Sequence, residues 1–550
     1  MRELLLNGAQ INTTDRAGCT PLMHALESPA ASLALVQLLL DSGGAVADST
    51  RYNLAAVSLR GGDPLKLVLV LERGADLYYT RGPGTDALMD AACGRNAGRD
   101  PQLLELLRAL IARGVALNGI TSDKLSALRW LSRIGRFDAV KLLLDAGADE
   151  SQLAWTPLHR AVALGTLADV KTLVEHSGCT EAVDLWGRTP WLVAVKTGDL
   201  EKARYLVDRG ADTKVTGKGD VSPLELAIES FHTPMLKWLI EFGISVESSA
   251  DCCVTPLMTA VETGNLEAVD VLIAAGADVD RRTPCGTALD RVQTREIALR
   301  LLDAGADPAE LSFEGRRALV GLDPHPDESL IDVALDTAAA CWGNRNPELM
   351  DRPFWQAMIR SGIDAYAAAQ LVGRTRDACP VWCAQRFGQS LTLLPDGRAI
   401  QIGGEHEDSD DPDFCIYNDV FVHHPDGRID ILCYPADVFP PTDFHTASLI
   451  GDSIYIIGRL GYQGTRHFGE TPVYCLDTST LQISRIETTG DKPGWISGHR
   501  AVLISPNEIL VRGGKIPARA GEKETYDDNR DSYVLNVTGH HWRREPGSSQ

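Results

Sequence analysis

A loop dense in carboxylates, at residues 404–415, is where this 550-residue chain comes nearest to a chemical site. Clustered carboxylate oxygens beside an imidazole nitrogen are ligands that divalent cations accept. The spacing does not match a calcium-binding loop, and a solvated loop between two strands has the same composition. We therefore expect no metal; a site in this loop would use Glu405, His406 and Asp408.

Other patterns that accompany catalysis are missing from the sequence. It contains no nucleophile elbow, no phosphate-binding loop and no dinucleotide fingerprint. Its glycine-rich stretch at residues 458–464 does not precede a predicted helix. The twelve cysteines follow neither zinc-ligand nor disulfide spacing, which favours reduced thiols in a cytoplasmic protein. The sequence therefore predicts no catalysis and no cofactor.

The charge of the chain limits its partners. The formal net charge is −22 at pH 7, and 44% of the residues are hydrophobic. Phosphate backbones and anionic membranes repel an acidic surface, so we expect no nucleic acid, no membrane and, for a protein partner, a basic one. No apolar run is long enough to span a membrane. Abundant Ala, Gly, Arg and Leu with few Lys are typical of a bacterial chain.

The elements that would carry a binding site come from a unit that recurs through residues 1–320. In residues 255–278, Thr-Pro begins one short helix, Gly264-Asn265 ends it, and a second helix ends at Gly276. The spacing between successive copies is 32 or 33 residues in six of eight cases. Each copy has one apolar face that it cannot bury alone, so the copies must stack. The first position of the unit falls at Thr20, Asn53, Asp86, Ser126, Thr156, Thr189, Ser222, Thr255 and Thr287.

This period and its internal offsets resemble ankyrin repeats, and Thr156–His159 with Ala161 is closest to the family signature. The resemblance implies about nine repeats, the first of them incomplete. It also implies that finger tips and the inner helix face are free of core packing and bind a protein partner. The candidate partner-binding residues are Trp155, Trp186, Arg188, Lys196, Lys218, Glu229, Asp251 and Glu262.

The sequence pattern changes twice after the repeats. Residues 321–378 predict a helical cap or linker, and residues 379–545 alternate β-branched residues with paired glycines such as Gly403-Gly404. Three segments of four predicted strands resemble kelch motifs, with Trp542 in the place of the blade tryptophan. Propellers usually have four to eight blades, so ring closure stays open. A divergent blade in the linker, a second chain that self-associates to complete the ring, and an open stack of sheets all fit.

The predicted fold is thus multidomain: an α-solenoid of ankyrin repeats followed by an all-β, kelch-like, propeller-type domain. We expect a protein-interaction scaffold that binds through the concave ankyrin face. One alternative is a kelch-domain enzyme or carbohydrate-binding module with the array as its targeting arm. Another is an immunity or inhibitor protein for a basic partner.

Overall fold

The computed structural model describes residues 10–15, 18–45, 53–94, 96–177, 181–247, 254–308, 311–327, 342–350, 352–371, 381–406, 414–520 and 523–545. The predicted helix at 330–340 and the candidates Asp251 and Asp408 lie outside these residues. The chain forms two compact units, and each is described by itself. Unit 1 is residues 1–278 with 283–285, and unit 2 is residues 279–282 with 286–550.

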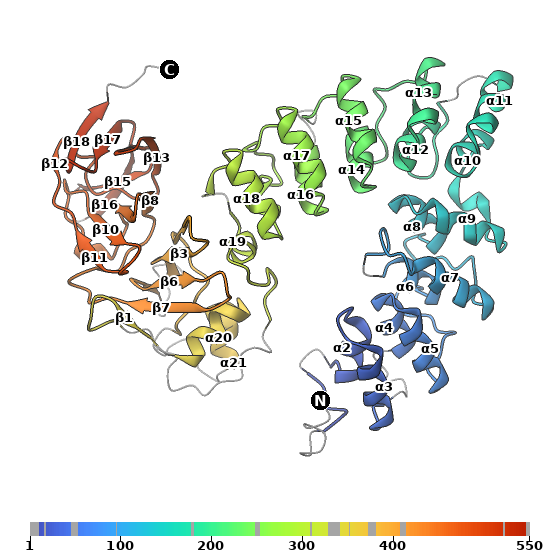
Figure 1. Ribbon diagram of the computed structural model, residues 1–550, viewed down its shortest axis with the longest axis horizontal. Coiled ribbons are helices and arrows are strands. Elements are labelled where there is room, and N and C mark those ends of the chain that lie inside the picture. Colours follow the sequence, from blue (N-terminus) through green and yellow to red (C-terminus); the bar gives the residue numbers. More distant parts are fainter. Residues whose placement is uncertain are drawn as a thin grey trace. The chain divides into compact units, whose positions relative to one another are not determined.

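Unit 1 is a series of helix pairs. Figure 1 shows the first helix of each pair on the inner side of a curve and the second on the outer side. The pairs are α2 (Pro21–Glu27) and α3 (Leu33–Asp41), α4 (Leu54–Gly61) and α5 (Pro64–Glu72), α6 (Ala87–Ala92) and α7 (Leu103–Ala112), α8 (Ala127–Ile134) and α9 (Phe137–Asp145), α10 (Pro157–Leu164) and α11 (Leu167–Ser177), α12 (Pro190–Thr197) and α13 (Leu200–Asp208), α14 (Pro223–Glu229) and α15 (Thr233–Glu241), and α16 (Pro256–Glu262) and α17 (Leu266–Ala274).

The recurring Thr-Pro pair begins first helices as the sequence predicts. The hydroxyl of Thr156 accepts the amide of His159, and Thr255 does the same for Met258. Such a cap contributes about 1 kcal/mol, and proline at the next position needs no amide partner. His159 then joins two repeats, because its Nε2 lies 2.9 Å from the carbonyl oxygen of Arg188. Burial lowers the pKa of His159, so it is neutral.

Two buried lysines join neighbouring repeats. Lys66 donates to the carbonyls of Ala25 and Ser28 at the end of α2, at 3.0 and 2.7 Å. Lys202 is the equivalent lysine in a later repeat. It donates to two carbonyls at the end of α10, at 3.0 and 2.9 Å. The last carbonyls of a helix have no partner inside the helix, so the ammonium groups satisfy acceptors that burial would otherwise leave bare. The apolar core fills the remaining space between the helices.

Unit 2 begins with α18 (Arg295–Asp303) and α19 (Phe313–Leu319), continues through α20 (Pro353–Ser361) and α21 (Ala365–Leu371), and ends in β-sheets. The first sheet has the order β1-β7-β6-β3-β2, the second β11-β10-β9-β8, and the third β12-β18-β17-β14-β13. Two further strand pairs are β4–β5 and β15–β16. The strands are β1 (Glu348–Leu349), β2 (Ser390–Leu393), β3 (Ala399–Ile402), β4 (Glu405–His406), β5 (Cys415–Ile416), β6 (Val420–His423), β7 (Ile429–Cys433), β8 (Thr446–Ile450), β9 (Ser453–Ile457), β10 (Val473–Asp477), β11 (Ile483–Arg485), β12 (Thr489–Gly490), β13 (Arg500–Ser505), β14 (Glu508–Arg512), β15 (Lys515–Ala520), β16 (Lys523–Asp528), β17 (Ser532–Asn536) and β18 (His541–Glu545).

The three predicted four-stranded segments correspond to three sheets, which are antiparallel except for the parallel pair β12–β18, and the C-terminal region is all-β as expected. Trp542 is fully buried, between the second and third sheets. Within the described residues the sheets do not form a closed ring. Contacts also place α18 and α19 with the sheets, because Arg316 of α19 donates to the carbonyl of Gln389 at 2.7 Å. The two compact units divide near residue 279, and the domain boundary expected at 320 stays a prediction.

Candidate functional site

Three side chains form a partly exposed group on α8 and on the loop at residues 184–188 of unit 1. The guanidinium carbon of Arg133, on α8, lies 5.3 Å from the ring centre of Trp130 and 5.4 Å from that of Trp186. Arg133 is exposed and both tryptophans are half-buried. The negative faces of the two indole rings attract the cation, and the guanidinium stays in contact with water. We call these residues the Trp–Arg–Trp group.

A finger at residues 184–188 holds Trp186 in place. One carboxylate oxygen of Asp184 accepts the backbone amides of Trp186 and Arg188, each at 2.9 Å. Its other oxygen accepts Nε and Nη2 of Arg188 at 2.9 and 2.6 Å. Both charged side chains are buried. The finger is therefore closed by its own ion pair.

The same finger is fastened to α8 of the repeat pair that carries Arg133. Arg188 donates from Nη1 to the carbonyl of Ser132 and from Nη2 to its hydroxyl, both at 2.8 Å. Trp186 donates from Nε1 to the carbonyl of Arg129 at 3.2 Å. The Trp–Arg–Trp group is thus preformed, which lowers the ordering entropy that a binding event costs.

A second ion pair, buried on the lysine side only, lies at the ends of α12 and α14. Lys196 is fully buried, and its Nζ is 2.7 Å from a carboxylate oxygen of Glu229, whose side chain is 42% exposed. Burial lowers the pKa of Lys196, and the charge of Glu229 opposes this by raising it. A Cβ at Gly135 would stand 3.2 Å from Cε of Lys196, so the glycine leaves room for the lysine.

The structure brings several predicted site residues together. Trp186, Lys218 and Glu229 reach the surface, and the amide of Lys218 donates to the carbonyl of Trp186 at 2.8 Å. Arg188 and Lys196, expected to be free of core packing, are buried, and each is paired with a carboxylate: Arg188 with Asp184 of its own finger and Lys196 with Glu229 of the next repeat.

Two other candidates lie apart from the group. Trp155 is half-buried against the core, with its ring centre 6.3 Å from that of Phe137, so it serves packing. Glu262 is exposed at the end of α16.

Trp130, Arg133 and Arg99 were not among the predicted site residues. Trp130 and Arg133 are three residues apart on one helix and therefore share a face, which is a signal the sequence does contain. Arg99 lies in a seven-residue insertion at 94–100, which lengthens the step between the repeat starts Asp86 and Ser126 to 40 residues. It packs over the ring of Phe231 and donates to the carbonyl of Thr263 at 3.2 Å. The insertion therefore reaches repeats far along the array, which spacing alone cannot indicate.

The carboxylate loop shows one structural role among its described residues. His406 is buried, and its Nδ1 lies 2.6 Å from the hydroxyl of Tyr417. Glu405 precedes it on β4, paired with β5. A histidine engaged in this way is oriented by the sheet.

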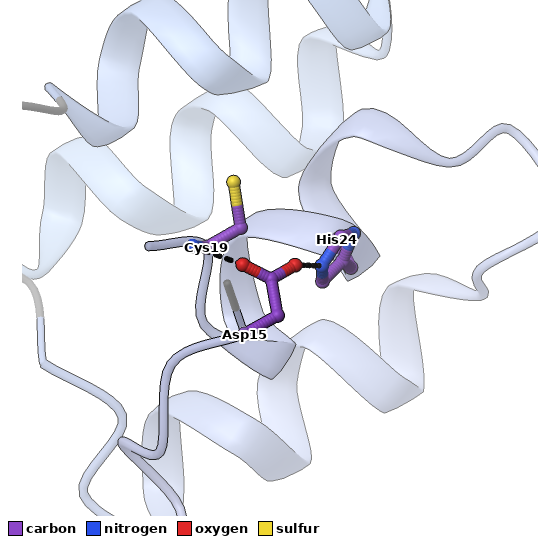
Figure 2. A group of neighbouring side chains, drawn as sticks. All are labelled: Asp15, Cys19 and His24. Atoms are coloured by element: carbon purple, nitrogen blue, oxygen red, sulfur yellow. Dashed lines mark hydrogen bonds and ion pairs between the residues drawn. The ribbon is translucent and has the colours of Figure 1, made fainter. Parts of the chain in front are cut away.

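Figure 2 shows a second group with metal-ligand chemistry, Asp15, Cys19 and His24. One oxygen of Asp15 accepts the amide of Cys19 at 2.8 Å, and the other lies 2.7 Å from Nε2 of His24. The ligand atoms of the three residues lie within 4.8 Å of one another. Asp184 makes the same turn contact with the amide of Arg188. The aspartate at this place is therefore a loop-closing residue of the repeat.

Unit 2 contains a cavity of about 500 Å³ lined by equivalent positions of all three sheets and by the loop and helix before them. His445 Nε2 lies 2.8 Å from the hydroxyl of Ser390, and His499 Nε2 lies 2.8 Å from that of Thr446. Burial lowers the pKa of His445 to about 3 and that of His499 to about 4. Both are thus neutral and link one sheet to the next, as their regular spacing suggests.

Comparison with known proteins supports the helical part of this description. Residues 88–183, 158–250 and 224–311 match the family model of ankyrin repeats in three copies. Among solved structures, the chain is similar to the ankyrin repeat domain of Bcl-3, a unique member of the IkappaB protein family. That similarity has 25% sequence identity, covers 33% of this chain and 87% of that chain, and has a TM-score of 0.27. No curated protein matches.

Every helix in the described part of the chain is too short or too polar to cross a membrane. The paired helices, the Thr-Pro caps and the sequence match agree. Residues 88–311 are therefore built of ankyrin repeats.

Proposed function

We propose that this chain is a protein-interaction scaffold whose ankyrin repeats bind a protein partner around the Trp–Arg–Trp group. The observation that carries the proposal is an exposed Arg133 on α8 beside two tryptophans, Trp130 of the same helix and Trp186 of the finger that the buried Asp184–Arg188 pair closes. Tryptophan and arginine are the residues most enriched at interface hot spots. A rigid, preformed surface of this kind needs no catalytic group.

The charges around the Trp–Arg–Trp group indicate which chemical groups a partner would present to it. Arg133 and Lys218 add positive charge near Trp186, although the whole chain is acidic. A partner that presents a carboxylate or an aromatic edge fits this point of the surface. The expected basic partner rests on net charge alone and would contact other parts of the array. The predicted cytoplasmic location and bacterial origin stay predictions.

A matched pair of variants tests this proposal. Arg204 and Trp238 form an equivalent pair, with 5.8 Å between the guanidinium carbon and the ring centre, but on the outer helices α13 and α15. Tagged full-length wild type, Arg133→Ala, Trp186→Ala, Arg204→Ala and Trp238→Ala would capture proteins from cells that express the chain. Quantitative mass spectrometry of the bound proteins then compares the variants.

The proposal expects a partner that is lost, by about tenfold or more, in both inner-face variants and kept in both outer-face variants. Equal loss in all four variants would instead indicate general destabilisation. Equal retention in all four would exclude the Trp–Arg–Trp group as the binding centre.

A second candidate function, small-ligand or carbohydrate binding in the β region, is favoured by the cavity between the sheets. Its rim carries Arg316 and Arg500 beside two histidines. Arg500 is paired with Asp307 at 3.2 Å, and Arg316 is bound to a backbone carbonyl. Titration calorimetry with neutral and acidic monosaccharides, in wild type and in Arg500→Ala, would reveal such a ligand.

A further inference from the structure

The cavity in unit 2 is lined by polar groups from distant parts of the sequence. Its volume of about 500 Å³ is typical of a small-molecule site. Ser390, Thr446 and Arg500, which line it, are the first residues of the equivalent strands β2, β8 and β13. Asp307 and Arg316 line it from the segment before the sheets. The charges and hydrogen-bond donors of these groups indicate which ligand would fit.

One positive charge on the wall of the cavity is not neutralised. Arg500 has a counter-charge, because its Nη2 lies 3.2 Å from a carboxylate oxygen of Asp307. His445 and His499, which also line the cavity, are neutral because burial lowers the pKa of each. Asp307 is the one carboxylate among the described residues of the wall, so Arg316 is left without a counter-charge. With two arginines and one aspartate, the described wall carries a single net positive charge.

Arg316 keeps donor groups that its neighbour Arg317 does not. Arg317 donates from all three nitrogens of its guanidinium to backbone carbonyls. Arg316 donates from Nε to the carbonyl of Leu311 at 3.2 Å and from Nη1 to that of Gln389 at 2.7 Å. Its Nη2 has no partner among the described residues, and the two carbonyls do not neutralise its charge. The side chain is thus held in place while its charge and one N–H₂ group stay available.

The two hydroxyl groups on the wall also act as donors. His445 binds Ser390, and His499 binds Thr446, each through Nε2 at 2.8 Å. The Nδ1 atom of both rings is buried and has no partner among the described residues. A proton on Nδ1 would be a buried N–H group without an acceptor, so the proton belongs on Nε2, which donates to the hydroxyl oxygen. Each hydroxyl hydrogen is then left to donate to a ligand.

A wall of this kind is complementary to one negative charge on an organic molecule. The two hydroxyls and the Nη2 of Arg316 favour an atom that only accepts hydrogen bonds, as the oxygens of a carboxylate do. A phosphate dianion would exceed the single positive charge, and an inorganic anion would fill little of the volume. Leu391, Ala447 and Ala501 line the cavity with apolar groups that the rest of the molecule would contact.

We propose that the cavity of unit 2 binds a small organic molecule with one carboxylate group, and that Arg316 recognises this group. The inference rests on the second candidate function, ligand binding in the β region, and adds the charge of the ligand and the residue that selects it. It is independent of the Trp–Arg–Trp group, which lies in unit 1.

Two matched pairs of probes test the inference on the full-length protein. They are phenylacetate with phenylacetamide, and glucuronate with glucuronamide. The members of a pair differ in charge and little in shape, and the two pairs differ in the polarity of the rest of the molecule. In titration calorimetry, the carboxylate of at least one pair should bind wild type about tenfold or more tightly than its amide, since the amide cannot form a charge-assisted contact with Arg316.

Substitutions on the wall test the role of Arg316. Arg316→Gln should remove the preference for the carboxylate, whereas Arg316→Lys, which keeps the charge, should retain part of it. The matched control is Arg428→Gln, in the exposed turn between β6 and β7, which should leave the preference unchanged. Asp307→Asn should tighten carboxylate binding by about threefold to tenfold, because Arg500 then adds a second positive charge. A gain of this kind cannot arise from partial unfolding.

The outcomes separate this inference from the function on which it rests. Equal binding of the carboxylate and the amide to wild type, or a preference that survives Arg316→Gln, would overturn the inference and leave ligand binding in the β region standing. Binding of neither member of either pair would overturn both.

Discussion

Neighbouring repeats of unit 1 are joined by buried charged groups, whereas neighbouring sheets of unit 2 are joined by apolar faces and neutral histidines. In unit 1, Lys66, Lys202 and Arg188 reach the backbone of an adjacent repeat. In unit 2, His445 and His499 are two of the polar links beside the apolar contacts, and Arg398 and Tyr434, which donate to carbonyls of the second sheet, are others.

The difference follows from geometry. Short helices present several unpaired carbonyls at each end, and a long cation can satisfy them from the next repeat. Sheets satisfy their backbone internally, so their faces are free to be apolar. The following predictions test this contrast, from the largest effect to the smallest.

Asp184→Ala should cost the most. It leaves the guanidinium of Arg188 buried without its carboxylate, and breaking a buried pair costs about 3–5 kcal/mol. Denaturant unfolding should show this loss, and hydrogen exchange should rise in α8 and α12. Asp208→Ala, at the exposed end of α13, is the control and should change stability by less than about 0.5 kcal/mol. An equally small loss for Asp184→Ala would mean that the ion pair does not join the repeats.

Lys202→Met should cost less, about 1–3 kcal/mol, because it keeps the buried stem and leaves two helix-end carbonyls without a donor. The exposed Lys237→Met is the control. If both variants unfold at the same denaturant concentration, the lysine bridges are incidental to the array.

The sheet links should be sensitive to acid. In His445 and His499 the folded pKa lies below the ordinary value of 6.5, so the unfolded chain binds more protons between those values. Their contribution to the free energy of unfolding is therefore fully present above about pH 6.5. It falls as the pH is lowered toward 3–4, by up to about 1.4 kcal/mol per pH unit for each histidine. His445→Gln introduces the residue type that the first sheet has at the equivalent position, Gln389. It should lower the slope of the free energy of unfolding against pH by the contribution of one proton. Urea titrations from pH 4 to pH 8 measure it, and an unchanged slope would contradict the assignment.

Arg133→Ala should have the smallest effect on stability, about 0.5–1 kcal/mol, because an exposed cation–π contact contributes little. Arg204→Ala, in the equivalent outer pair, should give a similar value. A much larger loss for Arg133→Ala would make this residue a structural link like Arg188 and would weaken its proposed role in binding.

Part of the fold was predictable because each repeat is specified by residues that lie close together in the sequence. The Thr-Pro starts, the terminal glycines and the paired strands predicted the helix pairs and the sheets, since each depends on residues close in sequence. The exposed partner of Trp186 was not predicted. Arg133 precedes it by more than fifty residues, and the burial of Arg188 depends on the serine of another repeat.

The sequence by itself therefore determined the repeat unit, its period, the ankyrin repeats in residues 88–311 and the all-β character of the C-terminal region. Hydrophobic periodicity and capping act within a few residues of one another, so a linear pattern contains them. Only the tertiary structure decided that Lys196 and Arg188 are buried, that Arg133 lies beside two tryptophans, and that Val502, Leu503 and Ile504 of β13 are exposed. These properties depend on which repeat or sheet lies beside which, and a side chain's neighbours across that interface are distant in sequence.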